Sequence, residues 1–566
     1  MRIRQSQLLN RSSCRLALFF LGVILSLVNL GKLQAQSLGK ELFILDSLYL
    51  QQVNVADTAA PYELYEKLTN LPHFMTKESV IRRGSHLFFT PGDTVSPHNV
   101  DEFERYLREL GVFSHVNFNV DFGDTATSRS IHRILQAKVD DSWSLVVKPY
   151  HELGEDRTAW LLIEENLFGY AKKLGIGGDL LSPSDSTWRG IVTYRDPDFL
   201  GTSHRLESFV LFSQPLTRVE VDLQRPFYTD RMAHSWGGGF QFADGKDLFF
   251  FRNSDPNPDP QYFTDTNYSL RYDAEAWYGN SNREDDLFHA SLRVDYNRYD
   301  LESGNPHPRA FENSFGLFGG IGSLRRDYAH LEGYEFSGPR LVPIGAQGRV
   351  SIGKIFPHSG GLDDLVYIGA DVRKSMLSGD FYSFVMAEAG TGFQEKETAF
   401  TMFRATASGG LKLGPGVLAV KGQLSTIWRW PRYVLLPASQ GDIGLRGYGE
   451  LEVLGDNRLG FNVDYRLFPL IDLELWELGI AGFWDVVRSW NQAELFSDLP
   501  FHNGAGIGLR IGNSKSLNSG FIRVDFGWNF DRGALGEISF EISFSAHEAF
   551  DIFGTLDFDP PGVYMP

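Results

Sequence analysis

The chain reads FHASLRVDYN from Phe288 to Asn297, and every second residue in this stretch is apolar. Its polar members are His289, Ser291, Arg293, Asp295 and Asn297. Successive side chains of a β-strand point to opposite faces, so a period of two predicts a strand with one apolar and one polar face. Residues 219–223 and 537–544 alternate in the same way.

The number of such segments favours a membrane barrel over a soluble sheet. A soluble sheet also alternates, so alternation alone does not decide between them. Here, segments of about ten residues repeat for roughly 400 residues from Trp143 onward, which is typical of an outer-membrane barrel. A soluble sandwich of that size would show several fully apolar core strands, and few are present. We therefore predict an antiparallel transmembrane β-barrel over residues 143–546, with a soluble β-sandwich enzyme as the alternative.

The N-terminus has the pattern of a secretory signal peptide. A basic start precedes an apolar run from Leu16 to Leu30, and Leu33-Gln34-Ala35 is a suitable cleavage site. The run is short for a transmembrane helix, so we predict that residues 1–35 are removed, with an uncleaved anchor as the alternative. No other stretch approaches a helical span in length, so a mature chain in a membrane must cross it as a barrel.

Composition excludes several functions. The formal net charge is -18, and loss of residues 1–35, which hold five basic and no acidic residues, takes it to -23. Such an acidic chain is a poor nucleic-acid binder, because contacts to phosphate supply that affinity. The single cysteine, Cys14, lies in the predicted signal peptide, which excludes thiolate metal sites and cysteine nucleophiles in the mature chain. We find no catalytic, metal or cofactor constellation and predict neither an enzyme nor a cofactor.

Residues 41–140 have the pattern of a compact α+β domain. We predict strands at residues 43–53, 112–122 and 132–139, and helices at residues 76–83 and 96–110. In the second helix the apolar residues recur at spacings of three and four, and a glycine follows as a stop signal. Farther along, Asn166-Leu167-Phe168-Gly169 and Asp198-Phe199-Leu200-Gly201 share a pattern, which predicts two tight turns on the same barrel rim.

The most informative motif is Leu445-Arg446-Gly447-Tyr448, which lies in a loop (residues 440–456) between alternating segments. Two acidic residues follow on the polar faces of successive predicted strands, Asp464 and Asp485. A guanidinium can bridge two planar carboxylates, so a lumenal arginine would suit both. Taken alone, arginine beside glycine is equally compatible with a solvated loop.

These features resemble the BamA/TamA outer-membrane insertase superfamily, which includes the two-partner secretion transporters. Its signature has an Arg-Gly-aromatic loop and an acidic residue in each of two successive strands, matching Arg446, Gly447, Tyr448, Asp464 and Asp485. Residues 76–122 resemble a POTRA domain, and the two tight turns resemble early periplasmic turns of such barrels. The resemblance thus covers most of residues 41–550.

The resemblance implies a barrel of 16 strands, and roughly 400 residues would give each strand with its connection about 25. It also implies that the 440–456 loop folds into the lumen and that Arg446 pairs there with Asp464 and Asp485. Three features depart from the family. Only one POTRA domain fits, tyrosine stands at 448 where phenylalanine is commoner, and residues 547–566 follow the last strand as a predicted periplasmic tail.

The resemblance implies an outer-membrane protein that inserts or translocates client proteins. The POTRA domain, in the periplasm, would receive an unfolded client by strand pairing, and the barrel would release it through a seam or the lumen. Expected partners are outer-membrane lipids, the unfolded client and accessory periplasmic proteins, without nucleic acid. The alternative is a pore, lipid transporter or surface protein that uses the same scaffold without protein clients.

Overall fold

The computed structural model describes residues 42–55, 73–122, 132–151, 158–179, 189–213, 216–252, 262–282, 286–301, 313–334, 340–358, 363–395, 397–429, 444–448, 453, 455–473, 476–490, 500–513, 521–532, 537–545 and 550–563. The predicted signal peptide, residues 1–35, lies outside them. Within the described residues, no helix has the length and apolar character to cross a membrane.

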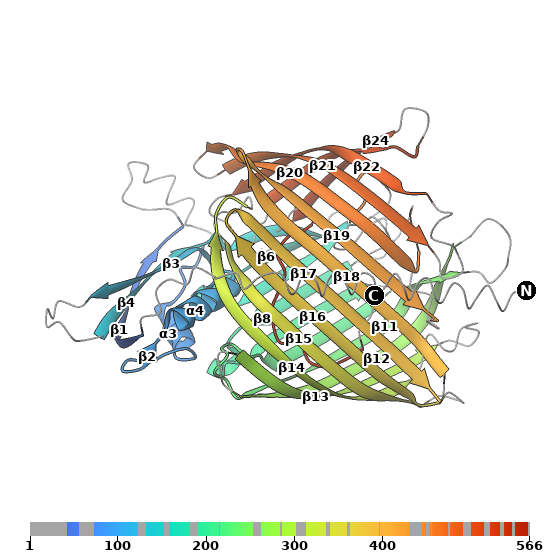
Figure 1. Ribbon diagram of the computed structural model, residues 1–566, viewed down its shortest axis with the longest axis horizontal. Helices are drawn as coiled ribbons and strands as arrows, with labels where there is room; N and C mark the ends of the chain where they lie inside the picture. The colour runs from blue at the N-terminus through green and yellow to red at the C-terminus, as the bar shows by residue number, and fades with distance from the viewer. Residues whose placement is uncertain are drawn as a thin grey trace, which may run out of the picture.

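An N-terminal α+β module precedes the barrel (Figure 1). Its four strands lie in the order β2-β1-β4-β3, with β1 and β4 parallel and the outer pairs antiparallel. The strands are β1 (Phe43–Val53), β2 (Thr94–Val95), β3 (Phe113–Phe122) and β4 (His132–Asp141). Helices α3 (Glu78–Ser85) and α4 (Pro97–Leu110) supply Ile81, Phe103 and Leu107 to its core.

Helix α4 begins and ends where its sequence predicts. The Ser96 hydroxyl accepts a hydrogen bond from the Asn99 N–H, Pro97 occupies the first turn, and Gly111 ends the helix in the left-handed region (φ 73°). Helix α3 differs by two residues from the predicted range 76–83. Its N-cap residue is Lys77, which makes no side-chain cap hydrogen bond, and the Thr76 hydroxyl accepts from the Asn166 amide.

The rest of the chain forms an antiparallel barrel, and among the described residues twenty strands run in sequence order around it, with β24 beside β5. The strands are β5 (Leu145–His151), β6 (Thr158–Glu164), β7 (Lys173–Asp179), β8 (Arg189–Asp196), β9 (Arg205–Ser213), β10 (Leu216–Arg225), β11 (His234–Arg252), β12 (Tyr262–Ser281), β13 (Asp286–Leu301), β14 (Ser314–Leu331), β15 (Arg340–Pro357), β16 (Leu365–Ser378), β17 (Phe381–Gln394), β18 (Glu397–Leu413), β19 (Gly416–Trp428), β20 (Asn457–Leu473), β21 (Trp476–Trp490), β22 (His502–Asn513), β23 (Phe521–Asn529) and β24 (Glu537–Ser545).

The structure therefore differs from the predicted 16 strands. The 16 strands were implied by the family resemblance, and the even division that agreed with them assumed strands of similar length, but the first six barrel strands have only 7 to 10 residues each. The longest neighbouring pair, β11 and β12, has 19 and 20 residues. Short strands joined by short turns fit more crossings into residues 145–225 than an average spacing allows.

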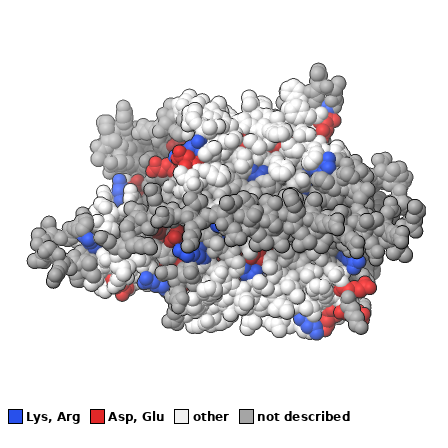
Figure 2. Space-filling model, in the orientation of Figure 1, with Lys and Arg blue, Asp and Glu red and all other residues white. Residues whose placement is uncertain are grey.

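The barrel wall separates apolar and polar side chains as the alternation requires. On β13 and β14, Phe288, Leu292 and Ile321 face outward and are 58%, 59% and 67% exposed, whereas His289 and Ser291 face inward and are buried. On the face shown in Figure 2, uncharged residues dominate the middle of the wall, and many charged ones lie towards its ends. An apolar outer wall is what a barrel needs in contact with lipid.

The module lies against one barrel rim, where the two repeated turns are found (Figure 1). In both turns the central residue has a left-handed backbone, Phe168 at φ 56° and Leu200 at φ 55°. The preceding side chain closes each turn, since Asn166 accepts from the Ala171 N–H at 2.8 Å. Gly169 in turn accepts from the Lys77 N–H of the module at 2.8 Å. The prediction of two tight turns on one rim is confirmed.

The C-terminal segment lies inside the barrel rather than in a periplasmic tail, for its described residues 550–563. The side chains of Phe550, Ile552 and Leu556 are buried against lumen-facing residues. The prediction of a periplasmic tail at residues 547–566 missed this position. The reason is that the contacts join the tail to strands between 84 and 231 residues earlier in the chain.

Candidate functional site

The structure brings Arg446 together with Asp464 and Asp485 inside the barrel. Arg446 Nη2 lies 2.6 Å from Asp464 Oδ1 and 2.8 Å from Asp485 Oδ1, and Arg446 Nε lies 2.8 Å from Asp485 Oδ2. The Arg446 backbone N–H also donates to Asp485, at 3.1 Å. All three side chains are buried. We call this group the loop lock, because it fixes residues 444–448 to strands β20 and β21.

Alternation along β20 and β21 positions the two carboxylates. Asp464 faces the lumen between outward-facing Val463 and Tyr465, and Asp485 lies next to outward-facing Trp484. On the same inner face of β21, the Phe483 ring lies 3.8 Å from the guanidinium carbon of Arg446. A ring face attracts a cation, so the guanidinium has attractive partners in its plane and above it.

The neighbours of Arg446 in the loop fit closely against β22 and β23. Gly447 has a φ of +95°, and a Cβ there would lie 3.3 Å from the backbone of Gly527. A Cβ on Gly527 would lie 2.8 Å from the Gly447 nitrogen, and one on Gly504 would meet the Arg446 carbonyl. The Tyr448 hydroxyl donates to the Asn503 carbonyl at 2.8 Å. The wall glycines thus form a flat seat for the loop.

Sequence reasoning missed part of this site. Gly504 was not among the predicted site residues, yet in the structure it accommodates the loop. Asn462 donates to the Gly444 carbonyl at 2.8 Å and to Asp485 at 2.5 Å. Arg466 lies 3.2 Å from Asp464 and also donates to the Phe550 carbonyl at 3.0 Å. Asn462 and Arg466 alternate with Asp464 along β20, which places them on its polar face, but alternation cannot identify their partners.

A second polar cluster joins the module to the barrel. His98 of α4 lies 3.2 Å from Asp230, in the segment between β10 and β11, and the Asp230 N–H donates to Glu102 at 3.0 Å. Arg326 of β14 lies 3.1 Å from Asp230 and 2.7 Å from Asp557 of the tail. We call these five residues the junction, because they connect the module, the rim, the wall and the tail.

The electrostatics of the junction favour a charged histidine. Burial lowers the pKa of His98, but the hydrogen bond to Asp230 and the charges of Glu102, Asp230 and Asp327 raise it above its ordinary value of 6.5 overall. The pKa of Asp230 is lowered overall, since His98 and Arg326 outweigh its burial. Both shifts favour an ion pair between His98 of the module and Asp230 of the barrel, whose side chains lie 3.2 Å apart.

The donor atoms of His98, Glu102 and Asp230 lie within 4.8 Å of one another, close enough to hold a metal ion. Arg326, however, lies 3.1 Å from Asp230 and 3.8 Å from Glu102, so a cation already neutralises both carboxylates. We interpret the cluster as an ion-pair network, and the absence of a metal site stays a prediction.

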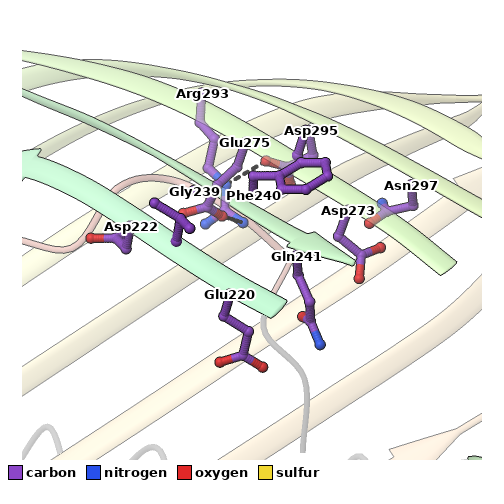
Figure 3. A pocket seen from close by; sticks show the side chains of 12 residues that line it. Glu220, Asp222, Gly239, Phe240, Gln241, Asp273, Glu275, Arg293, Asp295 and Asn297 are labelled. Carbon is purple, nitrogen blue, oxygen red and sulfur yellow. Dashed lines mark hydrogen bonds and ion pairs between the residues drawn. The ribbon is translucent and has the colours of Figure 1, made fainter. Parts of the chain in front are cut away.

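A separate lumenal hollow lies on β10 to β13 and has a volume of about 230 Å³ (Figure 3). Most of its ionisable lining is acidic, including Glu220, Asp222 and Glu275. Arg293 lies 2.6 Å from Glu275 and is the hollow's basic side chain. This acidic surface lies well apart in sequence from the loop lock and shares none of its residues.

Neither the known protein families nor the curated protein sequences include a match to this chain. Solved structures do resemble it. BamA from Haemophilus ducreyi lacking POTRA domains 1–3 is 14% identical, with 88% of this chain and 84% of that chain covered and a TM-score of 0.38. CdiB from Acinetobacter baumannii is 12% identical (88% and 73% covered, TM-score 0.38), and CdiB from Escherichia coli is 9% identical (91% and 92% covered, TM-score 0.41).

Proposed function

We propose that this chain is an outer-membrane β-barrel of the BamA superfamily that inserts or secretes client proteins, with its N-terminal module acting as a POTRA domain in the periplasm. The observation that carries the proposal is the loop lock. Arg446 is held by two buried carboxylates on successive strands, at 2.6 and 2.8 Å. A simple pore has no need of a loop fixed to its inner wall through an arginine that two buried carboxylates hold.

The N-terminal sheet supports the client-receiving role. Strand β3 pairs only with β4 among the described residues, so its other edge is open along a ten-residue strand. An open edge offers unpaired N–H and C=O groups to an extended chain, which is how β-augmentation binds peptides. The module also lies at the rim through Lys77 and Arg105, where a bound client would be close to the barrel.

The ends of the barrel sheet support lateral release. Strands β5 and β24 lie side by side and have only 7 and 9 residues. Pro149 in β5 has no N–H to contribute to a ladder, and proline is confined to edges and irregular positions of sheets. A seam between two short strands costs less to open than the long ladder between β11 and β12. No bond chemistry is needed, because insertion is downhill once strands pair and apolar faces reach lipid.

The test compares outer-membrane proteomes of cells with and without this gene, and of cells expressing Arg446→Ala or Arg298→Ala at matched levels. Arg298 is the control, since its pair with Asp300 is exposed. We expect loss of one or a few proteins in the deletion and with Arg446→Ala, and an unchanged proteome with Arg298→Ala. An unchanged proteome in the deletion would contradict the proposal and favour the pore, lipid-transport or surface-protein alternative.

A further inference from the structure

The segment after β24 has a built seat in the lumen that neither the fold nor the proposed function requires. Six cationic side chains on five barrel strands contact residues 550–560. We call them the basic track: Arg326, Arg340, Arg349, Arg373, Lys421 and Arg466. The tail they contact carries three aspartates and no basic residue between 550 and 566.

The track binds both the charges and the backbone of the tail. Arg326 lies 2.7 Å from Asp557, and Arg373 lies 2.9 Å from Asp559. Arg466 and Lys421 donate to backbone carbonyls, those of Phe550 at 3.0 Å and Asp551 at 3.2 Å. Charge-assisted hydrogen bonds of this kind are shorter and stronger than neutral ones. The site therefore recognises an acidic peptide in one direction and register.

Apolar pockets between the cations hold the other side chains of the tail. Ile552 and Phe553 pack in a buried cluster with Tyr334 and Tyr382, and the Phe553 and Tyr382 ring centroids are 4.9 Å apart. Farther along, Phe558 lies in edge contact with Phe227 at 5.1 Å. Gly410 of the wall leaves room for the Ile552 side chain, because a Cβ at residue 410 would lie 2.5 Å from Ile552.

The tail is nevertheless held in a way that permits release. Among the described residues, no backbone hydrogen bond joins 550–563 to a strand, and the segment has no regular secondary structure. Side-chain contacts can be exchanged one at a time, whereas a strand ladder must open cooperatively. A seat with matched charge and apolar pockets, but without a ladder, is typical of a peptide-binding site.

We propose that the basic track is a binding site for an extended peptide in which aspartates alternate with aromatic or aliphatic residues, and that the chain's own residues 550–563 are its resident, displaceable ligand. Arg326 belongs to both the track and the junction, so a client that moves the N-terminal module loosens the Asp557 end. Arg466 links the Phe550 end to the loop lock through Asp464. Displacement by a client rests on the proposed function, whereas binding of the tail does not.

The test measures ion conductance of the reconstituted barrel, which needs no client. The full chain is compared in planar bilayers with a chain ending at residue 545, each first checked for heat-modifiable migration. We expect severalfold higher conductance from the shorter chain, and block when a synthetic peptide of residues 550–563 is added. A control peptide with Asn at 551, 557 and 559 should block roughly tenfold more weakly, because it keeps the shape and loses the charge. Equal conductance of the two chains, or equal block by the two peptides, would overturn the proposal.

If the shorter chain does not fold, a crosslink in the full chain tests whether the tail occupies its site in the lumen. A Cβ on Gly320 would lie 3.0 Å from Pro561 Cβ, near the spacing of about 3.5–4.5 Å that a disulfide needs. In a Cys14→Ser background, G320C with P561C should crosslink, and reduction should raise the conductance. The matched control, G319C with P561C, should not crosslink, since residue 319 faces outward. No crosslink in the first pair would overturn the proposal, while leaving the proteome test of client insertion unaffected.

Discussion

Arg446 matters because two carboxylates depend on it. Asp464 and Asp485 are fully buried, so removing the guanidinium leaves Asp485 without a cation inside the barrel, whereas Asp464 keeps Arg466 at 3.2 Å. Breaking such a pair typically costs roughly 3–5 kcal/mol, less where water reaches the charges. We expect Arg446→Ala to lower the urea midpoint of the folded barrel in detergent far more than Arg298→Ala, whose ion pair is exposed. Similar midpoints for the two variants would contradict this.

Arg446→Lys separates charge from geometry. An ammonium restores the charge but is a compact point donor, whereas the guanidinium contacts Asp464 and Asp485 together through a planar fork. We therefore expect Arg446→Lys to recover part of the stability lost in Arg446→Ala.

The glycine seat of the loop gives a second prediction. A Cβ on Gly527 would lie 2.8 Å from the Gly447 nitrogen, so Gly527→Ala should lift the loop from the wall. Gly482→Ala is the matched control, because nothing lies within 4 Å of a Cβ there. We expect trypsin cleavage after Arg446, measured by mass spectrometry on intact barrels, to rise severalfold in Gly527→Ala and to stay at the wild-type rate in Gly482→Ala. Equal cleavage in both variants would mean that the loop does not depend on this seat.

Residues of the site differ in how far the sequence predicts them. Alternation assigns Asn462, Asp464 and Arg466 to one face of a strand, and the resemblance pairs Asp464 with Arg446. Neither relates Gly504 to the loop, because a strand pattern carries no information about what lies over its polar face. That contact is set by how the loop folds back across the neighbouring strands.

Helix α4 carries the pH dependence of the contact between module and barrel. The groups facing His98 are Glu102 on its own helix, Asp230 in the rim segment, and Asp327 and Arg326 on β14. Because the pKa of His98 is raised above 6.5 in the folded protein, its stabilising contribution is fully present below pH 6.5 and is lost as the pH rises through the folded pKa.

The measurement is hydrogen exchange of the α4 amides at pH 6 and pH 8, corrected for intrinsic rates. We expect protection of Pro97–Leu110 to fall at pH 8 in the wild type and to change less in His98→Gln. The Asp230 shift does not compete, since a lowered carboxylate pKa gives stability that is lost only below its ordinary value of 3.8. Protection that falls equally in both proteins would assign the effect to other groups.

Whole elements were predicted best where local chemistry decides them. Helix α4 has its cap, its spacing and its stop within fifteen residues, and the structure places it within one residue of the prediction. The position of the tail was missed because its partners lie on strands distant in sequence. The strand count was missed because it was carried over from the family resemblance, and the even division that agreed with it ignored how strand length varies along the wall, with seven residues in β5 and twenty in β12.

At the scale of the whole molecule, the prediction of a membrane barrel depends on which face of the wall contacts lipid. Ile321 faces outward on β14 and is 67% exposed, whereas Gln241 faces the acidic hollow beside Glu220 and Asp273 (Figure 3). A lysine at a lipid-facing position near the bilayer midplane costs about 2–4 kcal/mol, whereas a lysine in the lumen stays hydrated and would here meet carboxylates. Ile321→Lys should therefore strongly reduce the fraction that folds into lipid vesicles, and Gln241→Lys should fold like the wild type.

The two variants add the same charge, so a difference between them reports the environment of each face rather than the total charge. In a soluble β-sandwich, an exposed isoleucine would accept lysine at almost no cost, since surface substitutions usually change stability by less than about 0.5 kcal/mol. If Ile321→Lys folded as well as the wild type, this would contradict the prediction of a membrane barrel. The client-insertion proposal would then be contradicted as well. A loss confined to Ile321→Lys leaves lipid as the only surroundings that fit the apolar wall, with the acidic hollow and the basic track on the water side of the same strands.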